Sequence, residues 1–421
     1  MKSILKQIKN ERKSNTFLWA ELCLVFIILW FIVDMVYVTT RVYFAPMGFD
    51  IEHTYVMRLN RLTPKSVLYQ PDLTIDDDLE ALKEIVDRLA HRPDVEAVSI
   101  SQNCIPYNDG SNGIGFTIDS TSVSSLHRWI TPGFFQVFRY QNIDGSGSKS
   151  LDDALEEQTI VASVDVADQS PNFPVHGEAL RGQMVQVGSN KEAPKYRIAA
   201  LSEPVRYDHF TPAGHWESRY IATYLLDGSI KAMGAIRYLE VSLRVREGYT
   251  NGFADRLMEY ADQLYQVGNI YILDLQSLND IRRAHEMDNM NELRTQCCIL
   301  FFLLLNIFLG VIGTFWFRTQ HRRSEVALHM ALGASRSAVF KRLIFEGLLL
   351  LTFAVLPTMI VTFNLGYAEV VETSRMPFDI VRFLVGTLLA YALMALMIVV
   401  GIWYPARQAM NIQPAEALHE E

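Results

Sequence analysis

Four apolar segments, each about 20 residues long, limit what this chain can fold into. They are residues 17–38, 297–317, 343–363 and 383–403. At about 1.5 Å per residue, a helix of this length crosses the roughly 30 Å of hydrocarbon in a bilayer. A cleaved signal peptide is the alternative for the first segment, because basic residues precede it. That segment is longer than a usual signal core and lacks a small-x-small cleavage site, so we predict a retained anchor and an α-helical protein with four transmembrane helices.

The positive residues indicate the orientation of these helices. The N-terminal segment 1–16 and the loop 318–342 are basic, whereas the short loop within 364–382 carries Glu369, Glu372 and Asp379. By the positive-inside rule, the N-terminal segment, the loop 318–342 and the tail 404–421 are cytoplasmic. Residues 39–276 then form a large domain outside the membrane. The net charge of −9 gives no support for nucleic-acid binding.

The region 39–276 has the composition and patterning of a folded α+β domain. A strand-helix-strand pattern covers residues 54–59, 76–91 and 96–101, and a comparable pattern covers 237–245, 253–265 and 269–273. We predict one α+β layer built from residues 50–105 and 235–275. The turn-rich stretch 106–234 predicts a β-rich insertion, with strands at 159–163, 184–187 and 196–201 and loops at 110–115 and 144–148.

A helical pattern connects this domain to the second apolar segment. It runs through Leu278, Ile281, Met287 and Leu293 with no Gly or Pro before the membrane. We predict an uninterrupted stalk helix over residues 277–296 that passes rigid-body movement between the membrane and the outer domain.

Polar and small residues inside the apolar segments suggest contacts between helices. Asn306, Gly310 and Gly313 in the second segment are expected to serve helix contacts, either within one subunit or between two. For Glu21 and Asp34 in the first segment, placement at the membrane interface is favoured over an ion or proton pathway.

The loop 318–342 has a helical pattern of its own. Val326 and Met330, like Leu328 and Leu332, are four residues apart, Gly333 is a natural stop, and Ser335 can cap the following helix. The loop is therefore either a short helix lying on the membrane surface or an ordinary basic loop that only sets topology.

The sequence contains no recognisable catalytic or nucleotide-binding motif. It has no Gly-Lys dipeptide, which a Walker A loop requires, no CxxC, no Gly-x-Ser-x-Gly and no His-Glu-x-x-His. Asp208, His209, His215 and Glu217 form the best metal-like group, but their spacing matches no regular site, so polarity of a surface loop is the favoured interpretation. We predict no metal, no bound cofactor and no catalytic activity in this chain.

Three stretches resemble the MacB/FtsX-type ABC transporter permeases. Residues 323–328 (Arg-x-Glu-apolar-Ala-Leu) and 331–336 (Ala-Leu-Gly-Ala-Ser-Arg) resemble the cytoplasmic loop of that family, and residues 404–409 and 413–418 resemble its C-terminal tail. Residues 130–138 resemble a segment of the MacB-type periplasmic domain.

The resemblance implies a permease subunit in the inner membrane of a bacterium, with its large domain in the periplasm. It implies that a cytoplasmic ATPase, which binds ATP and Mg²⁺, docks on the short helix of the loop 318–342, and that a second permease copy, identical or paralogous, completes the complex. Closure of the ATPase pair would move the stalks and outer domains and so export or extract a substrate. The resemblance does not specify whether a periplasmic adaptor and an outer-membrane channel take part, and it does not identify the substrate. The residues placed in the docking helix are Glu325, Leu328, Ala331, Leu332, Gly333 and Ala334.

Two other functions use the same features. An FtsX-like signalling adaptor would regulate an extracytoplasmic hydrolase, although the cell-division relatives that do this carry smaller outer domains. A membrane-anchored enzyme fits the sequence worst.

Overall fold

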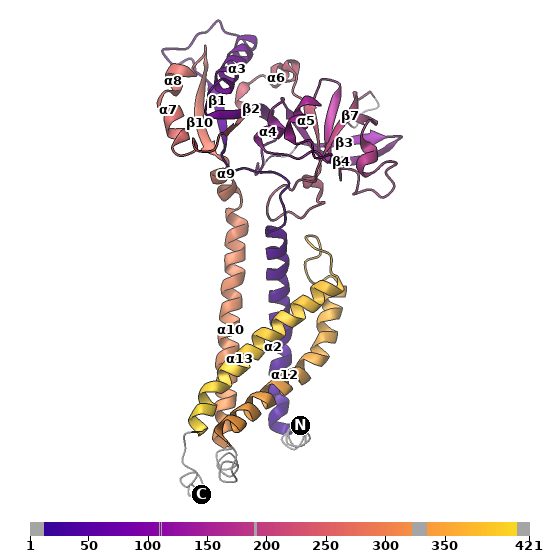
Figure 1. The fold of residues 1–421 in the computed structure, drawn as a ribbon, viewed down its shortest axis with the longest axis vertical. Helices are drawn as coiled ribbons and strands as arrows, with labels where there is room; N and C mark the ends of the chain where they lie inside the picture. Colours follow the sequence, from indigo (N-terminus) through magenta and orange to yellow (C-terminus); the bar gives the residue numbers. More distant parts are fainter. Residues whose placement is uncertain (1–11, 109, 111, 189–191, 322–334, 411–421) are drawn as a thin grey trace. The chain divides into compact units, whose positions relative to one another are not determined.

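The computed structural model describes residues 12–108, 110, 112–188, 192–321 and 335–410. The chain forms two units, Phe44–Asp288 and the pair of segments Met1–Tyr43 and Asn289–Glu421. In the described residues four helices are long and apolar enough to cross a membrane, and an α+β domain lies between the first and the second in the sequence (Figure 1). The predicted fold class is confirmed.

The membrane unit contains four long helices. They are α2 (Arg12–Tyr43), α10 (Met287–His321), α12 (Arg336–Tyr367) and α13 (Ile380–Met410). The spans within them are Leu18–Tyr43, Met287–Gly310, Ser337–Tyr367 and Ile380–Trp403. Helices α2, α12 and α13 pack around one apolar core that includes Phe26, Trp30, Leu351, Ala390 and Met394. In α10 the most apolar window has none of its described residues buried within this single chain.

Polar residues also hold the membrane unit together. Asp34 of α2 is 1% exposed and binds Arg382 of α13. The buried carboxylate of Asp34 is thus matched by a buried counter-charge.

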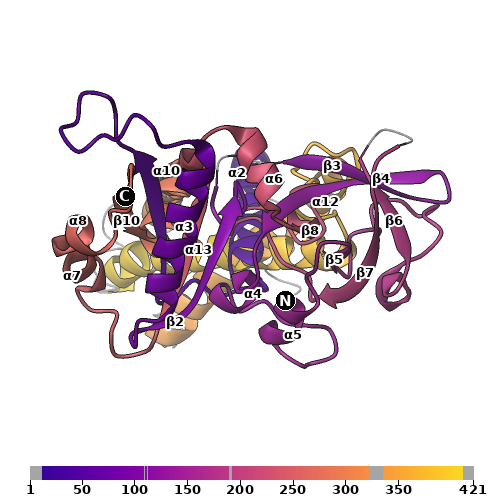
Figure 2. The ribbon, with the colours of Figure 1, turned by 90° about the horizontal axis from the view of Figure 1, so that it is seen from above.

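Four antiparallel strands form the α+β layer of the outer unit, as predicted. Their order is β10 (Ile270–Ser277), β1 (Thr54–Arg61), β9 (Glu240–Val245) and β2 (Val95–Gln102). One face is covered by the helices α3 (Ile75–Ala90), α7 (Phe253–Glu259) and α8 (Ala261–Leu264) (Figure 2). The apolar side of α3, with Leu79, Leu82, Ile85 and Leu89, lies in this core. This is the ferredoxin-like arrangement of two strand-helix-strand units.

The chain between β2 and β9 forms a second strand assembly. Its strands pair in the order β4 (Thr121–Ile130), β3 (Gly113–Ile118), β6 (Met184–Val187), β7 (Lys195–Ser202), β5 (Thr159–Ser163) and β8 (Tyr220–Tyr224). Because β8 also pairs with β4, these strands close into a barrel filled by residues such as Phe116, Ile160, Val185 and Ile221. Short helices complete the insertion: α4 (Phe134–Val137), α5 (Ser148–Asp153) and α6 (Asp227–Met233).

The segment 110–115 and the predicted stalk helix differ from the sequence prediction. The segment 110–115, predicted as a loop, contains the start of β3 at Gly113. The helix expected to run without interruption from Leu278 ends at His285 as α9 (Leu278–His285), and α10 begins at Met287. Glu286 between them caps α9 and its side chain is 4% exposed.

Candidate functional site

The predicted docking residues lie outside the described part of the chain. These are Glu325, Leu328, Ala331, Leu332, Gly333 and Ala334. The next described element is α12, and its first turn agrees with the sequence. Ser335 caps it, because its Oγ accepts a hydrogen bond of 3.2 Å from the amide of Ala338.

The predicted stalk residues lie in different surroundings. Leu278 is fully buried in the core of the outer unit, and Ile281 packs against the same core. Met287, in the first turn of α10, is 56% exposed, and Leu293 is half-buried. The beginning of the predicted stalk is therefore part of the outer domain.

Two adjacent histidine–carboxylate contacts lie where α9 ends and α10 begins. Nδ1 of His209 lies 2.6 Å from Oε1 of Glu286, and Nε2 of His285 lies 3.3 Å from Oδ2 of Asp208. All four side chains are at most 15% exposed. Two consecutive residues of one loop thus bind two consecutive residues of the helix junction. We call these four residues the junction cluster.

The surroundings of the junction cluster shift the pKa values of Asp208 and of the neighbouring Tyr107. Burial alone would raise the pKa of Asp208, but hydrogen bonds from His285, Thr211 and the amide of Phe210 hold it at about 2. The ring of Tyr107 stacks on His209 with 5.8 Å between centroids. Burial, together with the negative charge of Glu286, raises the pKa of the Tyr107 hydroxyl.

The same loop also binds the chain just after the first membrane helix. The guanidinium of Arg206 donates hydrogen bonds to the carbonyl oxygens of Ala45 (2.8 Å), His209 (2.8 Å) and Thr211 (2.9 Å). Ala45 follows α2 by two residues, and Glu286 precedes α10 by one. The loop 205–211 therefore contacts both connections between the outer unit and its neighbouring membrane helices.

This arrangement corrects the interpretation of the metal-like group. Asp208 and His209 are not polar groups of a surface loop, because Asp208 is buried and the His209 side chain is only 15% exposed. His215 instead lies 3.4 Å from Glu217, and both are partly exposed. Across the described ranges, no three His, Cys, Asp or Glu side chains gather in a way that suits a metal ion.

The predicted helix-contact residues lie on α10. Asn306 donates a hydrogen bond of 2.8 Å to the carbonyl of Phe302 in its own helix. Gly310 lies against Glu21 of α2, since a Cβ there would be 3.1 Å from the Glu21 carboxylate. A Cβ on Gly313 would meet nothing within 4 Å in the described residues.

Comparison with known families matches the C-terminal membrane region. Residues 297–414 match the family described as FtsX-like permease C-terminal. This match confirms the resemblance noted for residues 323–336 and for the part of the tail up to residue 414. Comparison with curated proteins gives no match.

Two solved structures resemble the chain over about half of its length. The periplasmic region of MacB from Actinobacillus actinomycetemcomitans has 12% sequence identity and a TM-score of 0.33, and the alignment covers 58% of this chain and 98% of that one. The extracellular domain of the noncanonic ABC-type transporter YknZ from Gram-positive bacteria has 9% sequence identity and a TM-score of 0.30. Its alignment covers 52% of this chain and 100% of that one.

Proposed function

We propose that this chain, whose C-terminal membrane region is that of an FtsX-like permease, is the membrane subunit of an ABC-type transporter. The match over residues 297–414 carries the proposal. The chain has no Gly-Lys dipeptide and therefore no Walker A loop, so ATP and Mg²⁺ belong to a partner ATPase. The subunit itself is non-catalytic.

The transporter works by transmitting movement to the outer domain. The contacts of the loop 205–211 support this, because Arg206 binds Ala45 and His209 binds Glu286. A displacement of either membrane helix is passed to this loop through hydrogen bonds to charged groups, each worth about 1.5–3 kcal/mol. From the loop it reaches the barrel through β8.

The ATPase docks on the loop 318–342 at the cytoplasmic face. The double substitution Leu328→Asp and Leu332→Asp tests this, because charged groups on the apolar stripe of the docking helix abolish binding. We expect the ABC ATPase that copurifies with the wild-type chain to be lost, while membrane insertion is unchanged.

A matched control carries the same substitutions on exposed apolar residues of the outer domain. Val67 is 100% exposed and Leu68 60% exposed. The double variant Val67→Asp and Leu68→Asp retains the ATPase. If the ATPase stays bound to the Leu328/Leu332 variant as well, the docking assignment is wrong.

The orientation follows from the same proposal. The chain lies in the inner membrane with both termini and the loop 318–342 in the cytoplasm and the outer unit in the periplasm. Single cysteines introduced at Ser337 and at Thr211, in a background without native cysteines, are labelled from opposite sides of the membrane by an impermeant maleimide. Labelling of both from the same side excludes the mechanism.

A second permease copy completes the complex. Helix α10 exposes Ile299, Phe301, Phe302, Leu305 and Leu309 to its surroundings in this single chain. An apolar face of this kind packs against lipid or against another membrane helix. Whether the second copy is identical or paralogous, and whether an adaptor and an outer-membrane channel take part, is decided by the composition of the purified complex.

A further inference from the structure

Among the described residues, one buried arginine of the outer unit has no acidic partner. Arg128 lies in β4 and is 6% exposed. In the part of the chain that the structure describes, no carboxylate oxygen lies within 4.0 Å of its guanidinium. Arginine keeps its charge in proteins, and a buried charge normally has a counter-charge.

The groups around Arg128 stabilise the cation only in part. Its Nη1 donates a hydrogen bond to the hydroxyl of Tyr140. The guanidinium also lies 4.6 Å from the ring centroid of Tyr220 and 5.4 Å from that of Tyr140. Cation–π contacts and one neutral hydrogen bond offset less than the lost hydration of a guanidinium, which has five N–H donors.

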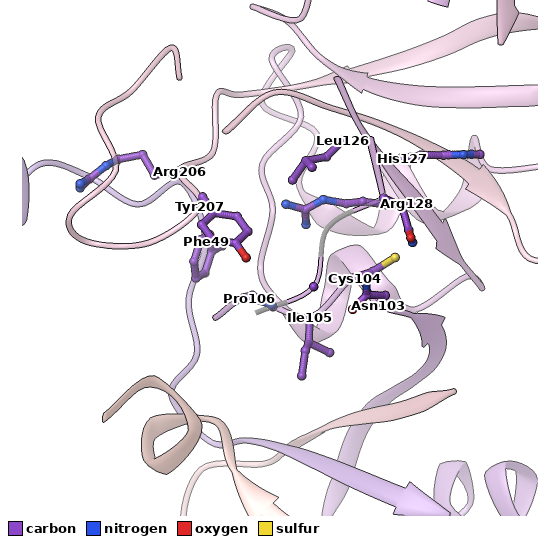
Figure 3. A pocket seen from close by; sticks show the side chains of 12 residues that line it. Phe49, Asn103, Cys104, Ile105, Pro106, Leu126, His127, Arg128, Arg206 and Tyr207 are labelled. Carbon is purple, nitrogen blue, oxygen red and sulfur yellow. The ribbon is translucent and has the colours of Figure 1, made fainter. Parts of the chain in front are cut away.

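The guanidinium faces a small cavity. The cavity has a volume of about 20 Å³, and its walls include Phe49, Ile105, Leu126 and Tyr207, with Asn103 and Asn112 beside them. Figure 3 shows the nitrogen atoms of Arg128 pointing into this space, whereas His127 points away from it. Space of this size takes one or two groups the size of a water molecule.

We propose that this cavity binds a carboxylate group on the guanidinium of Arg128. The planar fork of arginine matches the two oxygens of a carboxylate. The proposal concerns the outer unit alone and does not depend on the transporter function.

The charges around the cavity limit the ligand to one negative charge. Arg206 also lines the cavity, but its guanidinium is bound to three backbone carbonyls and points away in Figure 3. One cation therefore serves the ligand, which disfavours a doubly charged phosphate. The carboxylate is either a small free acid or the end of a longer chain. Phe49 and Arg206 also line a neighbouring pocket of about 680 Å³ that includes Pro46 and Pro204.

Calorimetric titration of the full chain in a neutral maltoside detergent tests the proposal. Sodium acetate, sodium hexanoate and sodium nitrate are titrated separately at constant ionic strength. We expect saturable binding of one carboxylate per chain, with nitrate weaker. Tighter binding of hexanoate than of acetate identifies a longer chain as the ligand, and equal binding identifies a small free acid.

The variant Arg128→Met removes the charge at similar length and lowers carboxylate affinity at least tenfold. Arg237→Met is the matched control, because Arg237 also contacts a tyrosine ring, that of Tyr238, but away from the cavity. The carboxylate affinity of Arg237→Met stays that of the wild type. Arg128→Lys keeps the charge without the fork and provides a second folded variant with weakened binding. Absence of saturable binding to the wild type, or equal binding by wild type and Arg128→Met, overturns the proposal.

Discussion

Arg382 in α13 binds Asp34 in α2 through two parallel hydrogen bonds. Nε donates to Oδ1 at 2.9 Å and Nη2 to Oδ2 at 2.7 Å, and the two residues are 0% and 1% exposed. A third donor of the same guanidinium binds the carbonyl of Met376. This bidentate pair fixes the first described membrane helix against the last one.

Removal of one partner of this pair destabilises the membrane unit. In Arg382→Met the Asp34 carboxylate stays buried without its counter-charge, which costs about 3–5 kcal/mol. The double variant Asp34→Leu and Arg382→Met recovers most of this loss. The midpoint of thermal unfolding of the detergent-solubilised chain measures the stability of the single and the double variant. Arg375 is a half-buried arginine in the loop before α13, and the control variant Arg375→Met changes this midpoint little. Equal midpoints for the single and double variants contradict the assignment.

Hydropathy was enough to predict the four membrane helices, because about 20 apolar residues have few alternatives to a membrane span. It could not identify the partner of Asp34, which lies 348 residues further along the chain. Periodicity likewise predicted both strand-helix-strand units of the outer layer. It missed β3, because Gly113 and Gly115 make that strand look like a loop, and it missed β4 and β8, whose parallel pairing closes the barrel.

The junction cluster was only half visible in the sequence. Asp208 and His209 belong to a local polar group in the sequence, but their partners His285 and Glu286 are 77 residues away. The signal that marks the partners is a consecutive His-Glu pair at the end of an amphipathic stretch. That pair also occupies the position where the predicted continuous helix is interrupted.

The pair of His209 and Glu286 contributes measurably to the stability of the outer unit. His209→Gln and Glu286→Gln each remove one partner of this contact while keeping a polar group, and a double-mutant cycle isolates their interaction. We expect a coupling energy of about 1.5–3 kcal/mol, as for hydrogen bonds to charged groups in buried surroundings. Denaturant unfolding followed by fluorescence provides the four free energies.

The exposed pair of His176 and Asp168 is the matched control. Nδ1 of His176 lies 3.4 Å from Oδ1 of Asp168, and the two side chains are 38% and 51% exposed, respectively. The corresponding double-mutant cycle gives a coupling energy below about 1 kcal/mol. If the two cycles give equal coupling, the junction cluster has no special role.

His127 makes the stability of the outer unit depend on pH. Burial lowers the pKa of its imidazole from 6.5 to about 4. The folded chain therefore holds His127 neutral, and the unfolded chain takes up the proton first as the pH falls. This contribution to stability is fully present above pH 6.5 and is lost between pH 6.5 and 4, by about 3 kcal/mol in total.

The variant His127→Gln isolates this effect from other titrating groups. Its unfolding free energy, compared with that of the wild type at each pH, reports the contribution of His127 alone. We expect the advantage of the wild type to shrink steadily from pH 7 to pH 4. A difference that stays constant over this range shows that His127 titrates normally.

Gly133 permits the tight connection between β4 and α4. Its φ of +100° lies in a region that other residues rarely adopt, and a Cβ there would overlap the carbonyl oxygen of Val98 in β2. Gly133→Ala therefore combines backbone strain with a steric clash and destabilises the chain by about 3 kcal/mol. Gly145 has a similar φ of +76° but open space around it, so Gly145→Ala costs only about 1 kcal/mol. Thermal unfolding separates the two effects, and equal losses for the two variants show that the clash with Val98 is relieved by local adjustment.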